Sequence, residues 1–230
     1  MIKTRRWGAA VLLFLLETAI ILSSPVRADV PDVPAQTPGT LVIDPGHGGL
    51  DGGASAPDGT TESGLNLSIS LRLASLARLF GVPIVLTREG ESLDYPAEIT
   101  GIREKKIWDQ RSRVDLINGI GNGILISVHQ NTYPDPRPSG TAVLYGSVPD
   151  SDLLALRLQQ NLIAQLCPEN RRVAAPIPDQ IYLMKHVRCP AVLVECGFLS
   201  NPAEAEKLKT DRYQTQIALV MIATYLQFTG

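Results

Sequence analysis

Residues 41–49 of this chain read LVIDPGHGG. Three apolar residues end in Asp44, and a proline with three glycines then interrupts any regular structure. A short apolar run stopped by Pro and Gly is typical of a buried strand that enters a sharp loop. In open α/β sheets, ligands bind outside the carboxyl ends of such strands, so His47 is well placed to bind a metal or polarise a substrate. The alternative is a turn whose histidine is solvated.

The rest of the chain alternates between strand-like and helix-like segments. Short apolar runs predict strands over residues 41–44, 82–87, 124–129, 141–145, 181–184 and 191–195. Apolar residues at helical spacing predict helices over residues 62–80, 107–120, 152–166, 202–209 and 212–228. We therefore expect one α/β domain of three layers, with a twisted, mostly parallel or mixed sheet of about six strands and helices on both faces.

The N-terminal segment has the pattern of an export signal. Three basic residues precede an apolar run that Glu17 interrupts, and small residues before Asp29 permit cleavage. We expect a cleaved signal peptide over residues 1–28, with an uncleaved N-terminal anchor as the alternative. A linker over residues 29–39 and a catalytic domain over residues 40–230 follow. The domain is expected to be exported and to meet a membrane only through an uncleaved anchor.

Charge and cysteine content exclude two classes of protein. Removal of the N-terminal segment takes away four of the 21 basic and one of the 23 acidic residues, which leaves a net charge of −5. Nucleic-acid binders carry a basic face, so no nucleic-acid partner is expected. Cys189 and Cys196 flank one predicted strand, which separates them by about 20 Å, beyond the ~7 Å limit for a disulfide. With Cys167 as the only other cysteine, no disulfide framework is expected.

Four ionisable residues fall at equivalent places in this pattern. His47 follows the first strand, Glu62 opens the first helix, His129 ends the third strand and Glu195 ends the last central strand. If the strands are mostly parallel, all four side chains project into one crevice. Two histidines and one carboxylate are a frequent ligand set for catalytic zinc, and a second carboxylate can move the proton of an attacking water. The residues therefore predict a metal site of two histidines and one glutamate.

Each of these residues also has a simpler interpretation. Glu62 stands in the first turn of a helix, where the dipole favours an acid, and His129 could be a satisfied strand-end histidine. Glu195 is harder to explain in this way, because an acid that ends an apolar strand risks burial and then needs a partner. Cys196 is a rival nucleophile, but successive strand residues face opposite sides, so we expect it to point away. Asp44 either orients a histidine or holds the turn.

Three further polar residues are expected to be structural or peripheral. His186 has no partner by spacing, so we expect it to be exposed or on the rim of the cleft. Arg113 and Asn118 lie five residues apart on a predicted helix, where a structural role is the simpler explanation.

These motifs resemble the zinc-dependent N-acetylmuramoyl-L-alanine amidases of the Amidase_3 family. The likeness covers nearly all of residues 41–228 with the motifs in the family's order. It rests on DPGHGG at residues 44–49, Glu62 at a helix start, residues 113–118, SVHQN at residues 127–131 and VECGFLSN at residues 194–201.

The resemblance implies a site and an activity. It implies one Zn²⁺ ion held by His47, Glu62 and His129, with Glu195 as catalytic acid and base. The family cleaves the peptidoglycan amide that joins the lactyl group of N-acetylmuramic acid to L-alanine of the stem peptide. Asn131 and backbone N–H groups of the glycine loop are candidates to steady the oxyanion or the substrate.

Residues 171–201 look most like the subgroup that acts in spore cortex maturation and germination. Its members remove the stem peptide in preparation of muramic δ-lactam, and a partner protein can be needed for their activity. Ser63 and Cys196 depart from the family's usual residues, but neither is among the four site residues. No wall-binding module is recognised in this sequence, so targeting is expected from the N-terminal segment, a protein partner or simple diffusion, and an activating or targeting partner is our prediction.

Two other functions compete with an amidase. A zinc carboxypeptidase-like peptidase acting on stem peptides needs a cation for the terminal carboxylate, and Arg88 and Arg137 are the loop candidates. A metal-free wall-binding module is the third possibility, although such a module has no use for a general base that faces a metal site.

Overall fold

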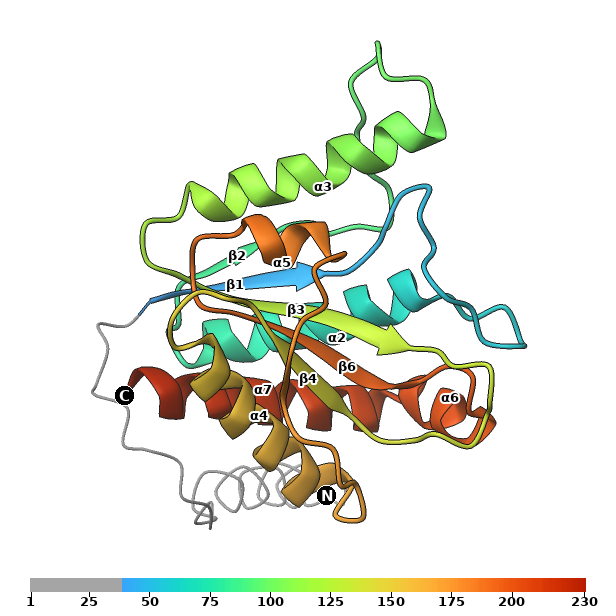
Figure 1. Ribbon diagram of the computed structural model, residues 1–230, viewed down its shortest axis with the longest axis vertical. Helices are drawn as coiled ribbons and strands as arrows, with labels where there is room; N and C mark the ends of the chain where they lie inside the picture. Colours follow the sequence, from blue (N-terminus) through green and yellow to red (C-terminus); the bar gives the residue numbers. More distant parts are fainter. Residues whose placement is uncertain (1–38) are drawn as a thin grey trace, which may run out of the picture.

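A six-stranded mixed sheet runs through the centre of the computed structural model, which describes residues 39–230 (Figure 1). The strand order is β2-β1-β3-β6-β4-β5. The strands are β1 (Thr40–Pro45), β2 (Ile84–Leu86), β3 (Gly123–Asn131), β4 (Ala142–Tyr145), β5 (Ala175–Pro176) and β6 (Ala191–Phe198). The first four strands in this order are parallel, whereas β4 runs antiparallel to β6 and β5 is parallel to β4. The expected mixed sheet is confirmed.

Helices cover both faces of the sheet. They are α2 (Glu62–Leu79), α3 (Ile102–Asn118), α4 (Ser151–Leu166), α5 (Tyr182–His186), α6 (Pro202–Leu208) and α7 (Asp211–Thr229). Figure 1 shows α3 and α5 on one face and α2, α4 and α7 on the other. The three-layer arrangement is therefore as predicted.

Apolar residues of the central strands pack against the helices on both faces of the sheet. Leu41 and Ile43 of β1 belong to the large core cluster with α2, α4 and α7, whereas Val42 between them belongs to the smaller cluster with α3 and α5. All three side chains are fully buried. A strand covered on both faces needs a continuous apolar run, which explains why β1 lacks a polar alternation.

The predicted strand over residues 181–184 is wrong, because this segment forms the short helix α5. The adjacent Leu183 and Met184 are both buried in the same core cluster, which a strand with alternating faces would not allow. Asn118 fixes the end of the helix, since its Nδ2 donates to the carbonyl of His186 over 3.0 Å and its Oδ1 accepts from the amide of Arg188 over 2.8 Å. The structural role expected of Asn118 is thus observed.

Other boundaries also differ. Helix α3 begins at Ile102 rather than at residue 107. The sequence did not reveal this earlier start, because the first half of the helix carries no buried residue and so shows no amphipathic pattern. Strand β5 was not expected; it has two residues and ends in a proline. Strands β3 and β6 extend beyond the predicted ends, to Asn131 and Phe198.

Cys167, Cys189 and Cys196 are free and buried, in line with the expected absence of a disulfide framework. None of the helices in residues 39–230 is long and apolar enough to cross a membrane. The segments predicted to be a signal peptide or anchor, and almost all of the linker, lie outside the described residues.

A buried ion pair joins four elements where β1 ends. Asp44 accepts hydrogen bonds from Thr87 Oγ1 after β2 (2.6 Å), from Ser127 Oγ of β3 (2.6 Å) and from the Arg113 guanidinium of α3 (2.8 Å). Burial alone would raise the pKa of Asp44, but the Arg113 charge and the two hydroxyl donors more than offset this, and its pKa lies below the ordinary value. Asp44 therefore remains charged and connects β1 to β2, β3 and α3.

Replacing Asp44 tests how much this ion pair contributes to the free energy of unfolding. Asp44→Asn removes the fully buried counter-ion of Arg113 and leaves it only Asp109, which lies 2.8 Å from its Nε, so we expect a loss of about 3–5 kcal/mol in the free energy of unfolding at pH 7. Since the folded pKa of Asp44 is lowered, its contribution is present above the unfolded value of about 3.9 and disappears as pH falls. Urea unfolding of both proteins should therefore give a difference that shrinks towards pH 3.

The matched control is Asp135→Asn. Asp135 pairs with Arg137 on the surface, and its replacement should leave the unfolding midpoint unchanged. Equal effects of the two substitutions would contradict a special role for the buried pair.

Candidate active site

The loop after β1 holds His47 in an unusual backbone conformation. Its φ of 60° lies in the left-handed region, which costs a non-glycine residue of order 1–3 kcal/mol. The carbonyl of His47 accepts hydrogen bonds from Arg88 Nε (2.8 Å) and from Arg113 Nη2 (2.6 Å). Paired backbone hydrogen bonds between Gly48 and Asp51, at 2.8 and 3.0 Å, close the loop. Two buried arginines thus hold the histidine at the carboxyl edge of the sheet.

Three predicted site residues converge on one point. Glu62 Oε1 lies 3.2 Å from His47 Nε2 and 3.0 Å from His129 Nδ1. One potential ligand atom from each of these residues lies within 4.8 Å of the others. The two imidazole rings stand edge to face with centroids 5.0 Å apart. Among the described residues, this is the one group of His, Cys, Asp or Glu side chains that could hold a metal ion.

Glu62 opens α2 but does not cap it. The N-cap is Thr61, whose side chain accepts from the amide of Gly64, so the Glu62 carboxylate is free to reach the histidines. Glu62 Oε2 accepts from the amide of Ala54 (2.8 Å), and its Oε1 accepts from the amide of Gln130 (3.1 Å). Burial would raise the pKa of Glu62, but its hydrogen bonds to the two histidines outweigh this and hold it well below the usual range.

The second ring nitrogen of His47 contacts an acid that sequence analysis missed. His47 Nδ1 lies 3.0 Å from Asp51 Oδ2. Burial opposes protonation of this ring, but the bonds to Glu62 and Asp51 prevail and raise the pKa of His47 to about 9. Asp44, which was expected either to orient a histidine or to hold the turn, bonds to Thr87, Ser127 and Arg113 instead of a histidine ring.

Glu195 lies beside His129 on the neighbouring strand. The two residues are Cα partners in the parallel β3–β6 ladder, so their side chains leave the same face of the sheet. Glu195 Oε2 is buried and has no hydrogen-bond partner within the described part of the chain. Burial raises the pKa of Glu195 to about 7, with opposing contributions from the charges of His129 and Glu62. A carboxyl group with a pKa near 7 is suited to both accept and donate a proton.

Glycines make room for these side chains. A Cβ atom at Gly46 would lie 2.3 Å from Cε1 and Nε2 of His129, and one at Gly53 would lie 2.6 Å from Glu62 Oε2. Gly53 also has a φ of 67°. The loop therefore approaches the histidine and the glutamate more closely than any chain with side chains at these positions could.

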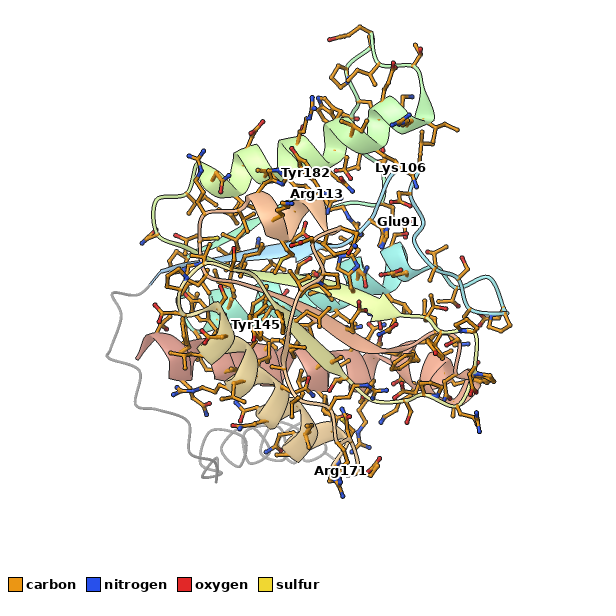
Figure 2. All side chains as sticks on the ribbon, in the orientation of Figure 1. Glu91, Lys106, Arg113, Tyr145, Arg171 and Tyr182 are labelled. Atoms are coloured by element: carbon orange, nitrogen blue, oxygen red, sulfur yellow. The ribbon has the colours of Figure 1, made fainter. Side chains whose placement is uncertain are left out.

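The four residues line a cavity of about 370 Å³, together with Asn131. Residues of α3 and residues 180–183, at the start of α5, form part of its lining. Figure 2 shows Arg113 and Tyr182 of these two elements near each other. The cavity is polar where the histidines and carboxylates meet.

The glycine loop offers fewer free donors than expected. The amides of Gly46, Gly48 and Gly49 donate to the carbonyls of Val128 (3.0 Å), Asp51 (2.8 Å) and Glu91 (2.7 Å). These three groups are already used within the fold, so they are poor candidates to stabilise an oxyanion.

The two arginines considered as carboxylate-binding groups are already engaged. Arg88 is buried and donates to five backbone carbonyls, and burial lowers its pKa to about 10. Arg137 pairs with Asp135 and does not line the cavity of the four site residues. Neither arginine supports a carboxypeptidase.

The remaining candidate residues do not belong to the group of potential metal ligands. Cys196 belongs to the core cluster on the α2, α4 and α7 face, and burial raises the pKa of its thiol. His186 is exposed and stacks on the ring of Tyr182 at 4.0 Å between centroids. Arg113 acts on the loop backbone and Asp44, which agrees with the structural role expected for it.

Comparisons with known proteins identify the family of this chain. The model of the Amidase_3 family, described as N-acetylmuramoyl-L-alanine amidase, matches residues 41–224. The germination-specific N-acetylmuramoyl-L-alanine amidase of Bacillus subtilis is 35% identical over 179 residues, which are 77% of this chain and 74% of that protein. The N-acetylmuramoyl-L-alanine amidase LytC of the same organism is 29% identical over 78% of this chain, which spans 33% of LytC.

A solved structure has the same fold. The CwlD amidase from Clostridioides difficile, determined in complex with the GerS lipoprotein, superposes with a TM-score of 0.79 and 33% identity, over 83% of this chain and 98% of that one. The family match, these relatives and the shared fold lead to one conclusion: the chain belongs to the Amidase_3 family and is an N-acetylmuramoyl-L-alanine amidase of peptidoglycan.

Proposed function

We propose that the protein is a zinc-dependent amidase in which His47, Glu62 and His129 bind one Zn²⁺ ion and Glu195 is the catalytic acid and base. The observation that carries this proposal is the convergence of two imidazoles and one carboxylate beside a second carboxyl group, which has a buried oxygen without a hydrogen-bond partner and a raised pKa. Both kinds of group are needed for metal-assisted hydrolysis of an amide.

The separations of the two histidine nitrogens from Glu62 Oε1 suit ligands of a tetrahedral ion. Zinc bonds to nitrogen and oxygen are about 2.1 Å long, so neighbouring ligands of a tetrahedral ion lie about 3.4 Å apart. The observed separations of 3.2 and 3.0 Å from Glu62 Oε1 are close to this value. Three protein ligands also leave a fourth position for water or substrate, as catalytic zinc requires.

Each residue then has a distinct part in the reaction. Bound zinc would polarise the amide carbonyl and lower the pKa of a water molecule. Glu195 takes the proton of the attacking water and delivers it to the departing L-alanine nitrogen, for which a pKa near 7 is suitable in both directions. Asn131, at the end of β3 and beside the cavity, is our candidate for binding the substrate or its oxyanion. The products are a free lactyl carboxylate and a stem peptide with a free L-alanine amine.

We assign to this protein the removal of the stem peptide from muramic acid, which prepares the formation of muramic δ-lactam. The similarity to a germination-specific amidase supports action on spore cortex peptidoglycan outside the cytoplasm. The CwlD amidase was determined with a lipoprotein, which supports an activating or targeting protein partner for this chain as well. Full activity of the isolated protein on native cortex peptidoglycan would count against that need.

Two substitutions separate metal binding from proton transfer. We expect His129→Ala to lose zinc and activity, because it removes a ligand. Glu195→Gln should retain zinc and lose at least ~100-fold in the rate of muropeptide release, because it removes the proton carrier. Zinc content by elemental analysis and products by mass spectrometry check both; a wild-type protein that holds no zinc would sink the proposal.

The close approach of the glycine loop gives a second test. Gly46→Ala places a methyl group against the His129 ring, so we expect the ring to move and zinc to bind at least ~10-fold more weakly. Gly52→Ala is the matched control, because the nearest atom to its Cβ is 3.8 Å away and no positive φ is required there. Chelator competition measures both affinities, and equal values would refute the steric argument.

Zinc binding should also depend on pH. The raised pKa of His47, about 9, means that this ring carries a proton at neutral pH in the metal-free protein. Zinc must displace that proton, so its apparent affinity should rise about tenfold per pH unit between pH 6 and pH 8. Glu195→Gln retains all three ligands and should give the same slope, whereas a flat profile would contradict zinc binding by a His47 ring that is protonated in the metal-free protein.

A further inference from the structure

Asp51 is bonded to the candidate metal ligand His47 and to a helix far along the chain. One carboxylate oxygen, Oδ2, lies 3.0 Å from His47 Nδ1. The other, Oδ1, accepts from Lys106 Nζ at 3.0 Å and from the amide of Gly53 at 3.4 Å. Both oxygens are therefore engaged, and the carboxylate has one orientation in which all three contacts are satisfied. Lys106 stands on α3 where that helix approaches the loop after β1 (Figure 2).

Helix α3 presents a polar face to the cavity. Lys106, Asp109, Gln110 and Arg113 all line it, and their spacing of three, four and seven residues places them on one side of the helix. The buried residues of α3 begin only at Arg113. The first half of the helix is therefore attached to the site through polar contacts, of which the Lys106–Asp51 ion pair reaches closest to a metal ligand.

We propose that Asp51 and Lys106 are positioning residues for the metal centre: Asp51 orients the His47 imidazole, and Lys106 holds Asp51 in the orientation that does so. This inference rests on the proposed function, in which His47 Nε2 binds zinc. When Nδ1 donates its hydrogen to a carboxylate, the tautomer is settled and the lone pair of Nε2 points at the metal. The same contact makes the imidazole a stronger ligand.

Lys106 matters because Asp51 would otherwise be poorly constrained. The Asp51 side chain is 29% exposed, and rotation about its terminal bond could bring either oxygen, or water, towards His47. The Lys106 ammonium engages one oxygen and leaves the other for the imidazole. The position of α3 thereby affects the geometry of a metal ligand that lies in a different part of the chain.

The test compares zinc affinities of the intact protein and its variants by competition with a chelating indicator. Asp51→Asn keeps the size of the side chain but provides a single acceptor oxygen for the three donors that contact Asp51, so we expect a 10- to 100-fold loss of affinity. Lys106→Met should lose about three- to fivefold, and Lys106→Arg should restore the wild-type value. The double variant should bind zinc as weakly as Asp51→Asn alone, because Lys106 acts through Asp51.

Lys105→Met is the matched control. Lys105 precedes Lys106 on the same helix, and its Nζ lies 5.2 Å from the Tyr95 ring centroid rather than on Asp51. It should bind zinc like the wild type. Circular dichroism and thermal unfolding of the metal-free proteins verify that the variants are folded, and the surface substitution Lys106→Met remains informative should Asp51→Asn fail to fold.

The outcomes separate this inference from the proposed function. If His47→Ala binds zinc like the wild type, the proposed ligand set itself is wrong. If His47→Ala loses zinc but Asp51→Asn and Lys106→Met stay within twofold of wild type, only the positioning role is overturned. A Lys106→Met variant that changes KM for peptidoglycan at unaltered zinc affinity would likewise overturn it, in favour of a substrate contact. The cobalt-substituted protein adds a spectroscopic check, because a reoriented His47 ligand shifts the visible absorption bands of Asp51→Asn relative to wild type.

Discussion

The buried ion pair between Asp44 and Arg113 is the constraint on which the edge of the sheet depends. Two charges removed from water are tolerated only when each is fully hydrogen-bonded, and here the carboxylate has two hydroxyl donors besides the guanidinium. The same guanidinium also reaches the carbonyls of Pro45 and His47. The backbone that carries His47 in a left-handed conformation is therefore tied to a helix and to the ends of three strands. A site built on such a framework needs little rearrangement to accept a metal.

The two glutamates of the site have different environments, which shift their pKa values in opposite directions. Glu62 receives hydrogen bonds from two backbone amides and lies against two imidazoles, which stabilise its charged form. Glu195 has a buried oxygen without a donor, and burial favours its neutral form. A difference of this kind suits the charged Glu62 to bind a cation and Glu195 to exchange a proton, as the proposed function requires.

The parts of the structure that depend on periodicity and burial were predictable from sequence. Strand β1, with its apolar run ended by an acid and a proline, and the long helices α2 and α7 were located closely because their cores are continuous. The convergence of His47, Glu62, His129 and Glu195 followed from parallel strands that end at one edge.

What could not be predicted depends on contacts between distant segments. Residues 181–184 have the composition of a strand, but their packing against the α3 face makes them a helix. Asp51 stands within an irregular glycine loop, where its place four residues after His47 does not by itself bring the two side chains together.

The two outermost strands of the sheet affect how copies of this protein can associate. Strand β2 has three residues, and β5 has two and ends in Pro176, which has no amide hydrogen to donate. Exposed strand edges are templates on which a second chain can add a strand, and short or proline-bearing edges suppress this. The sheet thus presents hardly any backbone for intermolecular pairing, so crowded copies of this protein have little opportunity to aggregate through their edges.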